Sequence, residues 1–216
     1  MKHQFHRTTT RCRQLLAAAS MCAALGTANA ANFTLSGDLT QDDQITWITL
    51  SLTTAGPVSV TSLGYGGGTD TLGHLRPGGG FDSMLFLYSA TGTLLAQSDD
   101  AINAAIDPGT GLASDAGFAT NLAVGTYKLA LTQYDNFALG NLAAGFSQAG
   151  AGNFTPTLSP SCTASSFCDW SGAGRTGHWV LAITGVSAVP EPASLLLMLG
   201  GLAALGGLAG RKTRTT

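Results

Sequence analysis

Residues 80–100 read GFDSMLFLYSATGTLLAQSDD. A run rich in apolar residues is followed by the turn sequence Ala90-Thr91-Gly92 and then by a second apolar run. Two such runs on either side of a short turn predict a β-hairpin. The second run ends in Asp99 and Asp100, so the sequence predicts two paired strands with an acidic end.

Strand signals continue on both sides of this hairpin. Apolar and polar residues alternate in four further segments, which are 33–36, 45–52, 58–61 and 178–184. Alternation with a period of two is typical of strands that bury one face, so Trp179, Leu181 and Ile183 are expected in the core. Residues 31–189 contain no amphipathic helix pattern of 12 or more residues. We therefore expect an all-β fold, with a single β-sandwich domain over residues 31–188.

The segment 63–80 contains eight glycines and predicts a long connection between strands. Gly68 and Gly73 have the spacing of a phosphate-binding loop, but His74 stands where such a loop requires a lysine. A nucleotide site is therefore excluded here, and a tightly turned loop across one end of the sandwich is the better interpretation.

The C-terminus has three parts in a fixed order: Pro190-Glu191-Pro192, an uncharged run over 193–210, and a basic end with Arg211, Lys212 and Arg214. As a helix, the run reaches roughly 27 Å, just short of the hydrocarbon core of about 30 Å. The basic end is expected to stay cytoplasmic. The run is thus a minimal membrane span. The alternatives are a membrane anchor that is never cut and a buried hairpin rich in Leu and Gly.

These three parts, over residues 189–216, resemble the PEP-CTERM sorting signal of Gram-negative bacteria. The resemblance implies a protein that is exported, held briefly in the inner membrane, cut by an exosortase near Pro190-Glu191-Pro192, and released or attached at the cell surface. It covers only this tail and implies nothing about the domain before it.

The N-terminus predicts the same route. Residues 1–30 open with basic residues, continue with an apolar stretch over 15–25, and end in Ala28-Asn29-Ala30, a small-x-small cleavage pattern. This is the pattern of a secretory signal peptide, with the mature chain starting near Ala31. The general secretion machinery is therefore an expected partner.

The charge is unevenly distributed along the chain. Residues 31–189 hold 11 aspartates, no glutamate and three basic residues, a net charge of −8, whereas the whole chain carries −2. Such a surface repels phosphates, which argues against nucleic acid and anionic lipid as partners. The preference for Asp is typical of turns and of sites for hard cations.

Two cysteines, Cys162 and Cys168, lie in the exported region. In an oxidising compartment we expect them to form a disulfide that staples a Ser-rich loop. We favour this disulfide over a zinc site. A zinc site would need four ligands of the Cys or His type, and only His74 and His178 remain to join the two cysteines.

The order of motifs in the domain resembles the bacterial pre-peptidase C-terminal domain, which is a jelly-roll-like β-sandwich. The motifs are Asp-x-x-Leu-x-Leu-Tyr from Asp82, Gly-x-Leu-Leu-Ala-x-Ser-Asp-Asp from Gly92, a later Asp, and Val-Gly-Thr-Tyr at 124–127. The segments Gly-Gly-Phe-Asp, Gln-Tyr-Asp-Asn-Phe and Phe-Cys-Asp are similar to a sandwich family found attached to PEP-CTERM tails. Together these resemblances cover residues 33–184.

In domains of the pre-peptidase type, similar acidic turns hold calcium. The resemblance therefore implies Asp99, Asp100 and Asp115 as candidate Ca²⁺ ligands, with Asp82 and Asp107 near the same acidic end. The alternative is that these residues form turns and keep strand ends soluble.

No catalytic motif marks the domain, because it has no Gly-x-Ser-x-Gly sequence and no two carboxylates stand out as a pair. We expect a non-enzymatic surface or extracellular-matrix protein associated with exopolysaccharide, in which Tyr65, Phe167 and Trp170 are exposed for stacking on sugars. The alternative is a secreted hydrolase that acts on matrix glycans or peptides.

Overall fold

The structure, a computed structural model of the 216-residue chain, describes residues 30–187. No helix within this range is long and apolar enough to cross a membrane. The predicted signal peptide over 1–30 lies outside the described residues apart from Ala30, and the predicted apolar helix over 193–210 lies wholly outside them.

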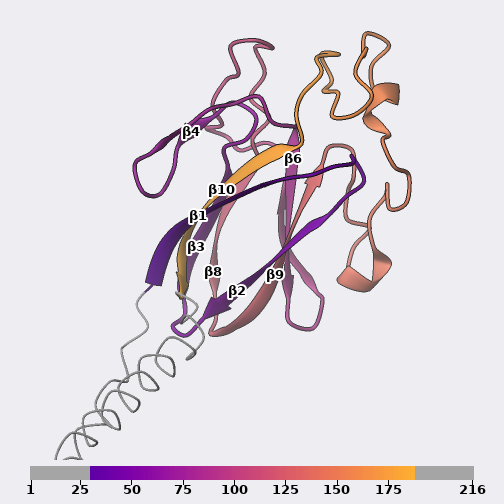
Figure 1. The fold of residues 1–216 in the computed structure, drawn as a ribbon. Coiled ribbons are helices and arrows are strands. Elements are labelled where there is room, and N and C mark those ends of the chain that lie inside the picture. The colour runs from indigo at the N-terminus through magenta and orange to yellow at the C-terminus, as the bar shows by residue number, and fades with distance from the viewer. Residues whose placement is uncertain (1–29, 188–216) are drawn as a thin grey trace, which may run out of the picture.

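The described chain forms two antiparallel four-stranded sheets that pack face to face as a sandwich (Figure 1). The first sheet has the order β1-β10-β3-β8, with bounds Ala30–Asp38, His178–Ser187, Gly56–Ser62 and Gly117–Leu122. The second sheet has the order β2-β9-β6-β7, with bounds Thr46–Leu52, Gly125–Gln133, Ser83–Ser89 and Leu94–Ser98. The remaining elements are the hairpin of β4 (Gly68–Thr69) and β5 (Leu75–Arg76) and the 3-10 turns η1 (Leu142–Ala144) and η2 (Thr155–Thr157). The all-β sandwich is thus confirmed.

The main core lies between the two sheets and is built from alternate strand residues. Val58 and Val60 of β3 and Leu181 and Ile183 of β10 face Leu129 and its neighbours in the second sheet, and all of them are fully buried. Trp179 is also buried, at 8% exposed. The predicted core positions of the last strand are therefore confirmed.

A second apolar cluster covers the outer face of the second sheet. Met84, Phe86 and Tyr88 of β6 point to this face and pack under Phe146, which belongs to the long connection after β9. Phe86 and Phe146 meet edge to face, with 5.4 Å between ring centroids. This cover explains why β6 is apolar at consecutive positions, because both of its faces are buried.

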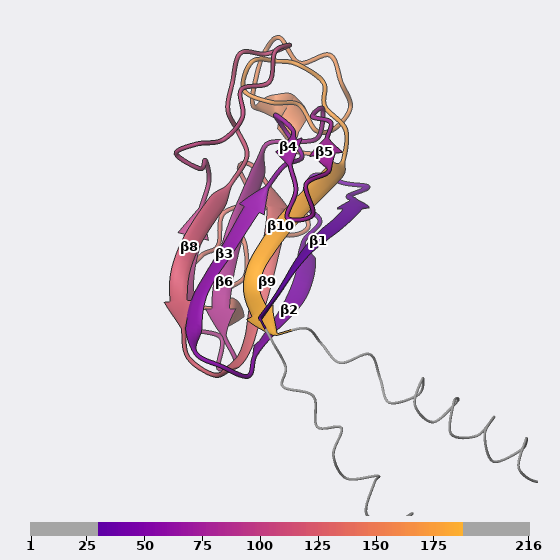
Figure 2. The same cartoon turned by 90° about the vertical axis from the view of Figure 1, so that its left-hand side faces the viewer.

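The two ends of the sandwich differ in kind. One end, here called the turn end, has the short connections 53–55, 90–93 and 123–124, and the described chain both starts and stops there, since Ala30 pairs with Ser187. The opposite end, here called the loop end, carries the long connections 39–45, 63–82 and 99–116 and both ends of the connection 134–177. The middle of that last connection reaches the turn end, where Leu142 N donates to Gly92 O at 2.8 Å. Figure 2 shows the long loops gathered at the top and the turns at the bottom.

Candidate functional site

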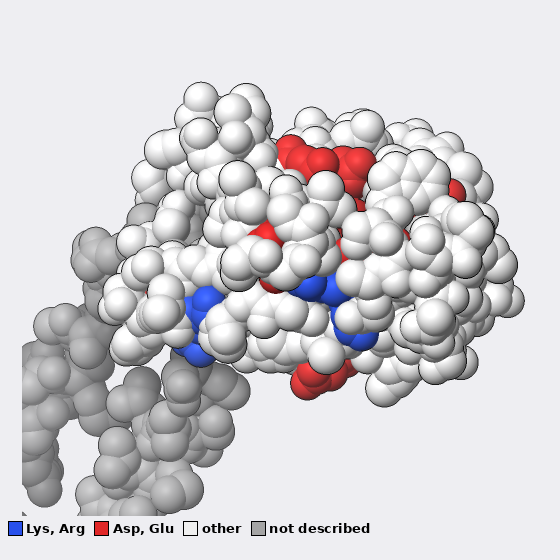
Figure 3. Space-filling model, turned by 90° about the horizontal axis from the view of Figure 1, so that it is seen from above, with Lys and Arg blue, Asp and Glu red and all other residues white. Residues whose placement is uncertain are grey.

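The acidic residues of the described chain all lie at the loop end. Each is the last residue of β1 or belongs to one of the long connections, and they are Asp38, Asp42, Asp43, Asp70, Asp82, Asp99, Asp100, Asp107, Asp115, Asp135 and Asp169. Figure 3 looks onto this end and shows acidic side chains gathered on it. The fold therefore concentrates the negative charge far from the turn end.

Asp82, Asp99 and Asp100 form a cluster at the loop end. Asp82 comes directly before β6 and the other two come directly after β7, and the pairing of Leu85 with Ser98 brings these strand ends together. One carboxylate oxygen from each of the three lies within 4.8 Å of the others. The predicted hairpin is thus what assembles the cluster.

The burial of Asp82 and the partial burial of Asp99 change how these two members of the cluster ionise, whereas Asp100 is exposed. Asp82 is only 8% exposed, and its Oδ1 atom has no hydrogen-bond partner within the described residues; the same is true of Oδ1 of Asp99. Burial, followed by the charges of Asp99 and Asp100, raises the pKa of Asp82 to about 8. Burial and the neighbouring Asp100 raise the pKa of Asp99 to about 6. The three carboxylates therefore do not ionise freely side by side at neutral pH.

A cavity of about 250 Å³ opens above the cluster. The three aspartates share its lining with Ser114, Leu112, Tyr134 and Trp170. Trp170 is 64% exposed, and its ring lies 6.3 Å from that of Tyr134 between centroids. The cavity therefore combines three carboxylates with an exposed aromatic ring in its lining.

These residues fit a hard divalent cation. Ca²⁺ takes six to eight oxygen ligands and accepts carboxylates from irregular loops. The cluster offers three carboxylates, two of which have an oxygen without a protein donor, next to the Ser114 lining. A bound cation would remove the mutual repulsion that raises the pKa of these groups.

Asp115 lies near this cluster but makes a different set of bonds. Its Oδ1 accepts hydrogen bonds from Ser62 Oγ at 2.6 Å and Tyr65 N at 3.0 Å, and its Oδ2 accepts one from Gly66 N at 2.8 Å. The residue is 1% exposed. Asp115 therefore anchors the start of the glycine-rich loop with donors from the protein.

Asp107 is also held by protein donors and lies outside the cluster. Both of its oxygens bind the Arg175 guanidinium, at 3.2 and 3.3 Å, and its Oδ1 accepts the N–H groups of Gly109 and Thr110. The hydrogen bond from Arg175 holds the pKa of Asp107 below its usual value. Of the five candidate ligands, the structure thus brings together Asp82, Asp99 and Asp100 only.

Two of the three aromatic residues expected at the surface are buried. Tyr65 is 0% exposed, because the Arg175 guanidinium covers its ring at 4.0 Å and its hydroxyl donates to Asp169 at 2.7 Å. Phe167 is 5% exposed and stacks on Phe81. Only Trp170 is exposed as expected, and the sequence held no signal that it would share a cavity with the acidic cluster.

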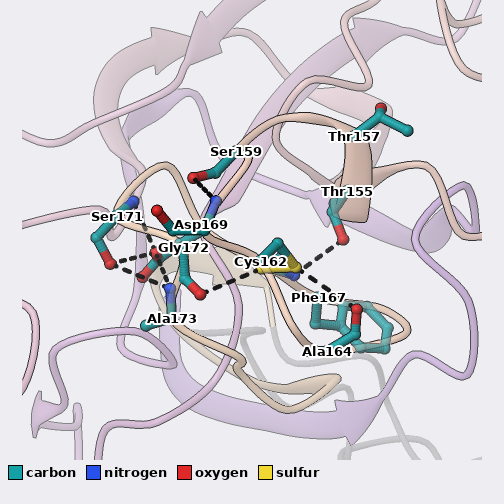
Figure 4. Close-up of a disulfide and its surroundings, with 12 residues drawn as sticks. Thr155, Thr157, Ser159, Cys162, Ala164, Phe167, Asp169, Ser171, Gly172 and Ala173 are labelled. Carbon is teal, nitrogen blue, oxygen red and sulfur yellow. Dashed lines mark hydrogen bonds between the residues drawn. A yellow bond between two sulfur atoms is a disulfide. The ribbon is translucent and has the colours of Figure 1, made fainter.

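The loop that carries Trp170 is fixed by a disulfide and by a buried aspartate. Cys162 and Cys168 are joined, as predicted, and Asp169 caps the next turn by accepting from Ser171 and Ala173 (Figure 4). Asp42, in the connection 39–45, accepts a hydrogen bond from Phe167 N at 2.7 Å. These bonds hold the Trp170 loop against the body of the sandwich.

Opening the disulfide is expected to lower the free energy of unfolding by about 2 kcal/mol, because the bond closes a short loop in the unfolded chain. Denaturant unfolding with and without a thiol reductant measures the difference. The control is the double variant Cys162→Ser with Cys168→Ser, which should have the lower stability in both conditions. An equal effect of the reductant on that variant would show that the reductant acts elsewhere.

The comparisons with known proteins bear first on the C-terminus. A family model described as the PEP-CTERM protein-sorting motif matches residues 188–214, a segment that includes Pro190, Glu191 and Pro192. The chain carries a PEP-CTERM sorting motif. This motif implies export, processing by an exosortase and sorting to the cell surface.

Among solved structures, the described domain is similar to that of the pre-peptidase C-terminal domain of collagenase from Bacillus anthracis. The identity is 14%, the TM-score is 0.35, and the match covers 70% of this chain and 88% of that one. A comparison with the curated proteins found no match.

Proposed function

We propose that this PEP-CTERM protein is a non-enzymatic component of the cell surface or extracellular matrix, that it associates with exopolysaccharide, and that its loop end is a calcium- and carbohydrate-binding site. The observation that carries the proposal is the cavity whose lining Asp82, Asp99 and Asp100 share with the exposed ring of Trp170. The sorting motif supports the location, since it sends the protein to the surface where such a ligand is found.

Calcium is proposed for the acidic cluster in the cavity lining. Asp82, Asp99 and Asp100 would hold the ion, and its positive charge would offset the negative charges of the three neighbouring carboxylates. Asp115 and Asp107 support the site from a distance, because they fix the loops around it without turning their oxygens to the cluster. On this proposal, the acidic cluster at the loop end reaches its functional state when it binds a cation.

Carbohydrate is proposed for the exposed aromatic part of the cavity lining. An exposed indole beside carboxylates is a common way to bind a sugar, since the ring packs on C–H groups while oxygens accept from hydroxyls. Trp170 supplies the ring, and Tyr134 beside it extends the aromatic surface. A net charge of −8 over residues 31–189 favours a neutral or cation-bridged glycan over a free polyanion.

We further infer that the sandwich is a jelly roll. With the β4–β5 hairpin set aside as an insertion, successive strands change sheet at every connection except the β6–β7 hairpin. Two Greek keys in an eight-stranded jelly roll produce this kind of alternation.

Replacing Trp170 by alanine is expected to reduce retention of the exported protein on the producing cell's exopolysaccharide by about tenfold, because a stacking contact contributes about 1–2 kcal/mol. Co-sedimentation of the purified protein with that polysaccharide, with Ca²⁺ present, measures it. Leu75→Ala is the matched control, since Leu75 is 81% exposed at the loop end but lies outside the cavity. Equal retention of wild type and the Trp170 variant would contradict carbohydrate binding at this site.

A secreted hydrolase is the second candidate, and one observation favours it. Asp82 and Asp99 are neighbouring carboxylates whose pKa values are raised to about 8 and about 6, a difference typical of an acid and a base acting together. A screen against matrix glycans and peptides tests this reading. Turnover that is lost in Asp99→Asn, while the thermal midpoint stays unchanged, would favour the hydrolase over the binding protein.

A further inference from the structure

The turn end of the sandwich carries almost no charge. Its three connections, 53–55, 90–93 and 123–124, consist of Thr, Ala, Gly and Val residues only. The segment 141–143, which lies against the connection 90–93, is also uncharged. Of the three basic residues between 30 and 187, Arg76 and Arg175 pair with aspartates at the loop end, and Lys128 lies within β9. Val124 at the turn end is 61% exposed. This end therefore offers an uncharged surface that costs little to desolvate.

The last strand is fixed to its final described residue. Ser187 pairs with Ala30, and its Oγ accepts from Thr53 N at 2.7 Å and shares a hydrogen bond with Thr53 Oγ1 at 2.8 Å. Val186 is 1% exposed and Ser187 is 7% exposed. The rigid fold thus extends through Ser187 without fraying into a linker.

The sorting motif follows this rigid end at once. The matched segment begins at residue 188, and only Ala188 and Val189 stand between Ser187 and Pro190. Pro190 is therefore three residue steps from Ser187, a span of at most about 11 Å in extended chain. An enzyme that recognises the motif must therefore approach to within contact distance of the turn end.

We propose that the turn end is a docking surface for the exosortase that processes this protein. The uncharged connections 53–55 and 123–124 contact the enzyme while it holds the sorting motif. The acidic loop end then faces away from the enzyme. The folded domain is in this way part of the substrate that the enzyme recognises, in addition to the motif itself.

The first test places charges on the proposed surface of the full-length chain, produced in a Gram-negative host that has an exosortase. The double variant Thr54→Asp with Val124→Asp is expected to slow processing about tenfold, because carboxylates would have to be desolvated at the contact. The matched control is Leu72→Asp with Ile102→Asp at the loop end, where both positions are exposed, at 62% and 102%. Pulse–chase labelling with mass spectrometry of the product measures the rate of processing.

The control variant should be processed at the wild-type rate, and Thr54→Asn with Val124→Asn should retain most of that rate because it adds polarity without charge. Equal rates for the two Asp variants, whether both slow or both normal, would overturn the proposal. The thermal midpoint of each processed protein shows whether the fold is intact.

The second test lengthens the spacer. Inserting about six Gly and Ser residues after Ser187 adds a flexible tether that uncouples the turn end from the motif. Docking predicts slower processing of this variant. If the domain were only an obstacle to the enzyme, the longer spacer would leave the rate unchanged or increase it, and either result would overturn the proposal.

Discussion

Changing Asp82 to asparagine is expected to abolish the rise in thermal midpoint that the proposed Ca²⁺ site should give the wild-type domain in millimolar Ca²⁺, and to stabilise the calcium-free domain at pH 8. Asp82 is the most buried member of the cluster and has an oxygen without a protein donor. Asparagine keeps the shape of the side chain but cannot carry a negative charge. The loss of this charge weakens the binding of a cation. It also removes the repulsion between residue 82 and the neighbouring carboxylates. Calcium binding and calcium-free stability are therefore expected to change in opposite directions.

The dependence on pH follows from the raised pKa of Asp82, which is about 8 in the folded protein against an ordinary value of 3.8. Above pH 4 the unfolded chain releases this proton, whereas the folded chain keeps it until about pH 8, so unfolding becomes easier as the pH rises through this window. The calcium-free wild type is thus expected to be more stable at pH 5 than at pH 8, by an amount on the order of 2–4 kcal/mol. The asparagine variant should lose most of this difference.

Thermal and denaturant unfolding of residues 31–187 at pH 5 and pH 8, with Ca²⁺ and with chelator, measure these effects. The control is Asp38→Asn, because the Asp38 side chain is 72% exposed and lies outside the cluster. A Ca²⁺-dependent rise that persists in the Asp82 variant would rule out this cluster as the ion site. A smaller pH dependence should remain in the variant, because the pKa of Asp99 is also raised, to about 6. A pH dependence of undiminished size would show that a group other than Asp82 causes it.

The strands were predictable where one face of a sheet meets the core. Alternation identified the segments that became β1, β2, β3 and β10, and the turn at 90–92 identified the β6–β7 hairpin. The strand β8, Gly117–Leu122, was not predicted, because its sequence GFATNL has few apolar residues. It is an edge strand held by β3 and has little of its surface in the core.

The candidate site was predictable only where it depends on neighbours in the sequence. The hairpin places Asp82 beside Asp99 and Asp100, and this proximity follows from local pairing. Asp115 could not be distinguished from them, since its donors Ser62 and Tyr65 lie about 50 residues away in the sequence and only the fold brings them near.

The same distant contacts reversed the expectation for Tyr65. An aromatic residue in a glycine-rich loop suggested a ligand platform, but Arg175 and Asp169 arrive from the last long loop and cover it. Glycine in this loop lets neighbouring backbone segments pack closely against it. A Cβ atom at Gly80, for example, would lie 2.1 Å from the carbonyl oxygen of His178. The loop is therefore packed between neighbouring backbones, and its composition alone did not indicate this.

Changing Asp115 to asparagine is expected to destabilise the domain by about 2–4 kcal/mol, which is the opposite of the effect expected for Asp82 in calcium-free protein at pH 8. Both oxygens of Asp115 accept from protein donors, so an amide NH₂ would face either the N–H of Gly66 or the two donors Ser62 and Tyr65. A buried donor facing a donor loses the bond and leaves both groups unpaired.

Denaturant unfolding of Asp115→Asn at pH 8 with chelator measures this loss, and Ser62→Ala, which removes one of the three hydrogen bonds, should lose only about 1 kcal/mol. If Asp115→Asn instead stabilised the calcium-free domain as Asp82→Asn does, Asp115 would belong to the mutually repelling cluster. The sign of the change therefore distinguishes an aspartate that anchors a loop from one that belongs to the proposed cation site.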